Sequence, residues 1–277
     1  EEPFVFKLVN GEWKLYGNQN DLDRTAPTVS EYKINNNDIY TNTLNVQLSF
    51  SVMDNNLAET VTLSGDLIET GDTDLSSPKN ITLTSTNGEK TVTAIFKDKA
   101  GNETIATDTI ILDNIGPNFL INPIIWGDTT QQVDIDFVVS DNFAKVKKVI
   151  FYYVDMDVQS PSLNDLTKVE QEFNDTEVNV SCTIPSRLAT DTPSGYAYYY
   201  FAAVDEINNT TYYTIKGETT VEPTSISELI KLQRVDFSAP TISIVQGAYT
   251  NTRNCTVQIT ELSKPSSRLV SGRIYGD

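Results

Sequence analysis

The sequence predicts an all-β protein made of tandem antiparallel β-sandwiches arranged end to end. Apolar and polar residues alternate over many short segments rich in Val, Ile, Thr, Tyr and Phe, which is typical of half-buried strands. Turn residues separate these segments, and only one short helical pattern occurs among them. Many short strands without intervening helices favour antiparallel sheets packed face to face.

The first two predicted strands form a hairpin at residues 4–16, where Asn10-Gly11 lies between two alternating segments. Asn-Gly at this place is typical of a type I′ turn. The helical pattern, at 225–232, has the spacing of a capping box from Ser225 to Glu228. The remaining predicted strands form two groups, at 44–53, 59–64, 80–85, 91–97 and 103–112, and at 131–140, 146–154, 167–173, 176–184, 196–204 and 210–215.

A repeated motif divides the chain into modules. An Asp stands four residues before a Pro at Asp23, Asp113 and Asp236, and the spacing of these motifs is about the size of one small sandwich. We therefore predict an N-terminal hairpin over 1–22, a first module over 23–114, a second over 115–216, a connector with a short helix over 217–237 and an incomplete third module over 238–277.

Two further motifs recur in the same order in both modules. A strand ends in Asp54-Asn55 and in Asp141-Asn142, and a later strand and its turn run from Asp98 to Asn102 and from Asp205 to Asn209. Together with the Asp-x-x-Ala-Pro motif, these segments resemble tandem bacterial immunoglobulin-like and fibronectin-III-like modules of cell-surface or secreted proteins. The resemblance implies immunoglobulin-like sandwiches and an extracellular or cell-surface location.

The composition excludes several kinds of function. The chain has no histidine, so it cannot form a Ser-His-Asp or Cys-His arrangement or an imidazole-bound zinc site. Its net charge of -18 disfavours binding to a phosphate backbone. No apolar run approaches the roughly 20 residues of a membrane helix. We expect no enzyme activity, no nucleic-acid partner and no membrane insertion in this segment.

Acidic residues recur where the start of the first strand and two loops share one end of such a sandwich. Calcium takes 6–8 oxygen ligands without strict geometry and is the one cofactor that this pattern predicts. The alternative is that these side chains cap turns by accepting hydrogen bonds from nearby backbone N–H groups. The candidate ligands are Asp23, Asp54, Asp98 and Asn102 in the first module and Asp113, Asp141, Asp205 and Asn209 in the second.

The second module is also predicted to carry an apolar, tyrosine-rich outer face. Where the first module has outward-pointing Thr and Ser, the second has large apolar residues, and such patches usually mark contacts. The face is expected to be covered by a partner, or by the chain itself through 155–175 or 225–232, with stacking of sugar rings as a third alternative. Its residues are Ile150, Tyr152, Val154, Tyr198, Tyr200 and Val204.

These features predict an extracellular structural or adhesive protein that acts as a spacer and a protein-contact surface. The incomplete ends fit a section of a longer protein. They also fit assembly head to tail into a filament, with the 4–16 hairpin completing the third module of another copy. The expected partner is a protein or a second copy, with a glycan as an alternative. The alternative functions are a phage virion decoration or tail protein and the non-catalytic carbohydrate-binding part of a secreted hydrolase.

Overall fold

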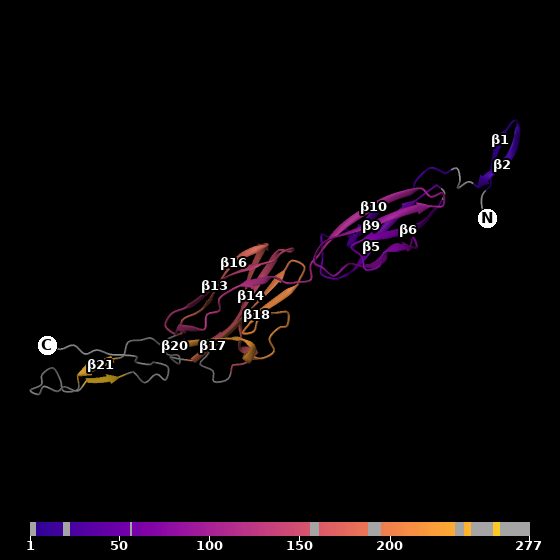
Figure 1. The fold of residues 1–277 in the computed structure, drawn as a ribbon. Coiled ribbons are helices and arrows are strands. Elements are labelled where there is room, and N and C mark those ends of the chain that lie inside the picture. The colour runs from indigo at the N-terminus through magenta and orange to yellow at the C-terminus, as the bar shows by residue number, and fades with distance from the viewer. Residues whose placement is uncertain are drawn as a thin grey trace, which may run out of the picture. The chain divides into compact units, whose positions relative to one another are not determined.

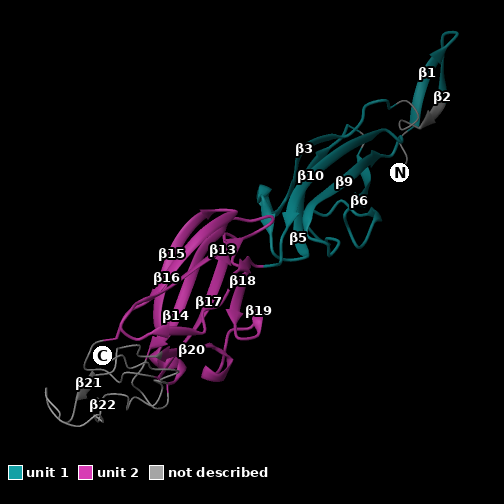
Figure 2. Ribbon diagram, turned by 60° about the vertical axis from the view of Figure 1, so that its left-hand side comes forward, with its two compact units in different colours: residues 1–115 teal, residues 116–277 magenta. Residues whose placement is uncertain are grey.

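The computed structural model describes residues 4–18, 23–55, 57–155, 161–187, 195–235, 241–244 and 257–260. These residues form strands and three short 3-10 helices, with no α-helix among them (Figure 1). Within the same residues, no helix is long and apolar enough to cross a membrane. The chain divides into two compact units, residues 1–115 and residues 116–277, which are described separately (Figure 2).

The N-terminal hairpin predicted from Asn10-Gly11 is confirmed. Strand β1 (Phe4–Val9) pairs antiparallel with β2 (Glu12–Asn18). Asn10 has φ 56° and Gly11 has φ 85°, and positive φ at both central residues is what a type I′ turn requires.

The first module is a sandwich of two sheets. Strands β3, β5 and β8 form one sheet, and the other has the order β4-β10-β9-β6-β7, with β4 parallel to β10. Leu48 and Phe50 of the first sheet pack with Val61, Val92 and Phe96 of the second in one core. The elements are β3 (Thr28–Ile34), η2 (Asn35–Asn37), β4 (Tyr40–Thr41), β5 (Asn45–Met53), β6 (Ala58–Gly65), β7 (Gly71–Thr73), β8 (Lys79–Thr82), β9 (Gly88–Asp98) and β10 (Glu103–Leu112).

The second module repeats this strand order. Strands β11, β13 and β16 form one sheet, and the other has the order β12-β20-β17-β14-β15, with β12 parallel to β20 and the β18–β19 hairpin beside β17. The elements are β11 (Asn118–Leu120), β12 (Trp126–Asp128), β13 (Val133–Ser140), β14 (Val146–Asp155), η3 (Leu163–Asp165), β15 (Thr167–Asp175), β16 (Glu177–Ile184), β17 (Gly195–Asp205), β18 (Thr210–Thr214), β19 (Gly217–Thr219), η4 (Ile226–Glu228) and β20 (Ile230–Val235).

Residues 217–237, predicted as a connector with a short helix, belong largely to the second module. The helical pattern yields only the single 3-10 turn η4, in which Ser225 Oγ accepts a hydrogen bond from Ser227 N at 3.2 Å. The chain then becomes extended, and β20 pairs with β17 and β12, burying Ile230 and Leu232. Short apolar runs do not distinguish helix from strand by periodicity alone, which explains the difference.

Most of the predicted third module, 238–277, lies outside the described residues. Within the described part, β21 (Thr241–Ile244) pairs antiparallel with β22 (Val257–Thr260).

Candidate cation site and contact face

Three carboxylates meet at one end of the first module. Asp23 precedes β3, Asp54 follows β5, and Asp98 ends β9. One carboxylate oxygen of each lies within 4.8 Å of the others. Asp98 is buried, whereas Asp23 and Asp54 are half-buried. The structure thus brings together the carboxylates of three of the four residues predicted for this site.

The fourth predicted residue, Asn102, acts on the cluster as a donor. Its backbone N–H and its Nδ2 donate to the two carboxylate oxygens of Asp98, both at 2.8 Å, and Nδ2 also lies 3.2 Å from the backbone oxygen of Asp23. Burial raises the pKa of Asp98, but the hydrogen bonds from Asn102 and the neighbouring backbone outweigh it, so the pKa lies below its usual value. Asp98 is therefore ionised at neutral pH.

The second module contains the same turn. Asn209 donates from its backbone N–H and Nδ2 to Asp205 at 2.8 and 2.7 Å. Asn208 has φ 69° where the first turn has Gly101 at φ 92°, so an Asn occupies the left-handed position there. Asp205 is fully buried, and burial, with a smaller contribution from the charge of Asp141, raises its pKa.

The other acidic residues predicted for the second site cap turns. Asp141 Oδ1 accepts hydrogen bonds from the backbone of Phe143 at 2.9 Å and Ala144 at 3.0 Å. Asp113 follows β10 at the end of the first unit, and its Oδ1 accepts from Ile115 N at 3.2 Å. Capping, the alternative given for these residues, is thus seen in the structure alongside the carboxylate cluster of the first module.

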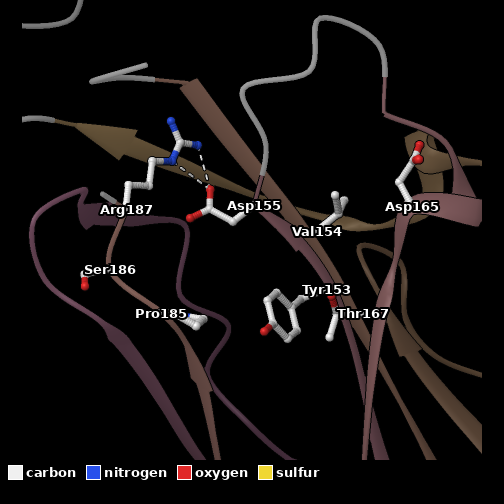
Figure 3. A pocket seen from close by; sticks show the side chains of 8 residues that line it. All are labelled: Tyr153, Val154, Asp155, Asp165, Thr167, Pro185, Ser186 and Arg187. Atoms are coloured by element: carbon white, nitrogen blue, oxygen red, sulfur yellow. Dashed lines mark hydrogen bonds and ion pairs between the residues drawn. The ribbon is translucent and has the colours of Figure 1, made fainter. Parts of the chain in front are cut away.

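A pocket of about 380 Å³ lies at one end of the second module, and Figure 3 shows its lining. Arg187 donates to Asp155 Oδ1 from Nε at 3.0 Å and from Nη2 at 2.6 Å. Arg234, which is fully buried, places Nε 3.4 Å from Asp155 Oδ2. Asp165, also in the lining, accepts from Ser162. Both lining carboxylates are thus engaged in contacts within the chain.

The described cysteine, Cys182, is buried in β16. Burial raises the pKa of its thiol to about 12, so the side chain is protonated at neutral pH and is not a reactive nucleophile.

Comparison with known proteins gives distant structural matches. No protein-family model and no curated protein matches the chain. The fibronectin(III)-like modules of CbhA from Clostridium thermocellum share 11% identity at a TM-score of 0.30, over 74% of this chain and 94% of that one. A tetra-tandem repeat from the extending region of a large adhesion protein shares 12% sequence identity at a TM-score of 0.32. The match covers 79% of this chain and 51% of that one. The SGBP-B protein of Bacteroides ovatus shares 12% sequence identity at a TM-score of 0.24. The match covers 80% of this chain and 64% of that one.

The strand order of the chain itself decides the fold. In both modules a three-stranded sheet faces a larger sheet. In the larger sheet a short early strand pairs in parallel with the last strand of the module: β4 pairs with β10, and β12 pairs with β20. The remaining pairs are antiparallel and follow the two-sheet arrangement of the immunoglobulin sandwich. Each module is an immunoglobulin-like β-sandwich.

The predicted contact face of the second immunoglobulin-like module is only partly exposed. Ile150, Val154 and Tyr200 are 6%, 5% and 4% exposed, so at these three positions the chain itself covers the face, which is one of the alternatives expected from the sequence. The other three predicted residues, Tyr152, Tyr198 and Val204, are half-buried.

The aromatic rings of this face contact each other. Tyr152 and Tyr200 stack with centroids 4.4 Å apart and planes 1° from parallel, and Tyr200 OH donates to Glu222 at 3.4 Å. Burial raises the pKa of both hydroxyls. Since sugar rings bind to open aromatic faces, this mutual stacking disfavours the two tyrosines as a sugar platform. Glu222 lies between β19 and η4, just before the 225–232 segment and outside both segments that were predicted to cover this face.

Proposed function

We propose that the chain is an extracellular, non-catalytic spacer of immunoglobulin-like modules, and that calcium fixes the entrance of the first module. The observation that carries the proposal is the convergence of Asp23, Asp54 and Asp98, which come from three segments far apart in the sequence. Asp23 begins the module, so a cation held by all three would tie the incoming chain to the two loops. That is the property a spacer needs at a junction.

The donor set fits a hard cation. Asp23 Oδ2 is buried and accepts no hydrogen bond from any described residue. No ion pair among the described residues involves Asp23 or Asp98. Two like charges about 4 Å apart repel by about 1 to 4 kcal/mol at effective dielectric constants of 80 to 20. A divalent cation would replace this repulsion with attraction, and calcium accepts carboxylate and backbone oxygens without strict geometry.

Thermal unfolding with calcium tests this proposal. The protein is treated with EDTA, dialysed and then scanned with added CaCl₂ or MgCl₂. Calcium at 100 times its Kd should stabilise the first module by about 2.7 kcal/mol, which corresponds to a rise in Tm on the order of 10 °C. The Asp54→Asn variant should lose this rise, because it removes one of the three charges while keeping the side chain's shape.

A matched control removes an acid of the same module outside the cluster. Glu69 is exposed, and Glu69→Gln should leave the calcium response unchanged. Equal Tm values in calcium and in EDTA, or a response that survives Asp54→Asn, would contradict the proposal. The second predicted set, Asp113, Asp141, Asp205 and Asn209, stays a prediction. Isothermal titration with calcium checks it, since this set would add a second equivalent of bound calcium.

A further inference from the structure

Two asparagine side chains contact the carboxylate cluster of the first module. Asn102 lies in the turn between β9 and β10, and Asn55 lies in the turn after β5. A carboxamide offers Nδ2 as a donor and Oδ1 as an acceptor, so each side chain can either hold a carboxylate or bind a cation. The two side chains differ in which of these roles their contacts permit.

The contacts of Asn102 fix the orientation of its carboxamide. Its Nδ2 lies 2.8 Å from Asp98 Oδ2, 3.2 Å from the backbone oxygen of Asp23 and 3.4 Å from the backbone oxygen of Thr25. The atom at this place must be the nitrogen, because all three neighbours are acceptors and would repel an oxygen. Asn102 therefore cannot turn its Oδ1 to the cluster without losing all three contacts.

The same contacts place Asn102 between a ligand of the proposed calcium site and the chain that enters the module. Its backbone N–H also donates to Asp98 Oδ1 at 2.8 Å, so it holds both oxygens of that carboxylate. Residues that orient a ligand without touching the metal typically change the metal affinity by roughly 10- to 100-fold when they are lost.

The carboxamide of Asn55 is held by one contact. Its Nδ2 lies 3.2 Å from Asp23 Oδ1, and this side chain makes no other hydrogen bond within the described part of the chain. Rotation about the Cβ–Cγ bond would bring Oδ1 to the place of Nδ2, and Asp23 Oδ1 would keep the hydrogen bond from Thr25 N at 3.0 Å. Asn55 is exposed, so its side chain has room for this rotation.

A cation in the cluster reverses the preferred orientation of Asn55. Without a cation, the Asp23 carboxylate attracts Nδ2. Calcium takes 6–8 oxygen ligands, and three carboxylates that bind through one oxygen each fill only part of that shell. Neighbouring ligands of one calcium ion lie about 3 Å apart, given metal–oxygen distances of roughly 2.3–2.6 Å. The 3.2 Å between Asn55 Nδ2 and Asp23 Oδ1 is thus also suitable for two ligands of one ion.

We propose that Asn55 Oδ1 is a further ligand of the cation, and that Asn102 positions the site without touching the ion. This inference rests on the proposed calcium site. Isothermal titration of the full chain with CaCl₂ tests it. Asn55→Ala and Asn102→Ala should each raise the Kd at least about 10-fold. Asn55→Asp should bind calcium at least as tightly as the wild type, because it keeps an oxygen at this place and adds a charge.

Terbium luminescence separates a ligand from a positioning residue, which a change in affinity alone does not. The lifetimes of protein-bound Tb³⁺ in H₂O and in D₂O give the number of water molecules on the ion. Asn55→Ala should raise this number by about one, because water replaces the lost oxygen. Asn102→Ala should leave the number unchanged.

Asn80 provides matched controls, since it is an exposed residue of the same module on β8. Asn80→Ala and Asn80→Asp should change neither the Kd nor the number of bound waters. If the wild type binds calcium but Asn55→Ala keeps both values, or if Asn102→Ala raises the number of waters, the inference is wrong and the calcium site stands. If the wild type binds no calcium, the proposed function fails and the inference fails with it.

Discussion

At the scale of single residues, the second module depends on a buried charge cluster. Asp155 contacts two guanidinium groups, and the side chains of Arg187 and Arg234 are 6% and 0% exposed. Arg234 Nη2 also donates to three backbone carbonyls, at 3.1 to 3.4 Å. Burial lowers the pKa of Arg234, while Asp155 acts in the opposite direction. The carboxylate is therefore what makes burial of two cations tolerable.

We predict that Asp155→Asn destabilises the second module by roughly 3–5 kcal/mol, because it leaves two buried guanidinium groups without their shared carboxylate. Urea unfolding followed by circular dichroism measures the loss. The control is Asp136→Asn, an exposed position on β13, which should change the free energy of unfolding by less than about 0.5 kcal/mol. If Asp155→Asn lowers the free energy of unfolding by less than about 1 kcal/mol, the charges of Arg187 and Arg234 do not depend on the Asp155 carboxylate, and the prediction is wrong.

The sequence predicted the acidic cluster of the first module but not this charge cluster. Repetition of Asp98 and Asp205 at matched places marked them as special, and the shared end of the sandwich explained why Asp23 and Asp54 lie near Asp98. Arg187 and Arg234 belong to no repeat and lie far from Asp155 in sequence. Arg234 lies on β20, which was not predicted as a strand, so no local pattern could have brought the three side chains together.

At the scale of elements, long strands were predictable and short ones were not. Strands such as β5, β9 and β13 alternate between buried and exposed residues over eight positions or more, and period two is then unambiguous. Strands β4, β7 and β19 have only two or three residues, too few to show a period. Strands β7 and β19 each pair with the strand directly before them, whereas β4 is defined by its pairing with β10, which is distant in the sequence and which a local pattern cannot reveal.

Strand β20 gives a direct test of the module boundary. A chain ending at residue 216 should lose the folding transition of the second module, because β17 and β12 lose their partner and the buried side chains of Ile230 and Leu232. A chain ending at residue 235 should keep it and serves as the control. Differential scanning calorimetry distinguishes the two, and a cooperative second transition in the shorter chain would contradict the role assigned to β20.

At the scale of the whole molecule, one strand order occurs twice in succession in the chain. A repeated motif, an Asp four residues before a Pro, located the starts of both modules because it marks the entrance of each sandwich, where the chain must turn into its first strand. It could not locate the end of the second module, since β20 follows the inserted β18–β19 hairpin and carries no repeated motif.

Each module has a hydrophobic core of its own, with no residue in common, so we predict two separable unfolding transitions. Leu63→Ala lies in the core of the first module and should cost about 2–5 kcal/mol, lowering the Tm of that transition by on the order of 10 °C and leaving the other in place. Ile135→Ala in the second core should have the reciprocal effect. Calorimetry of both variants makes the assignment, and a single transition that moves with either substitution would show that the modules unfold as one unit.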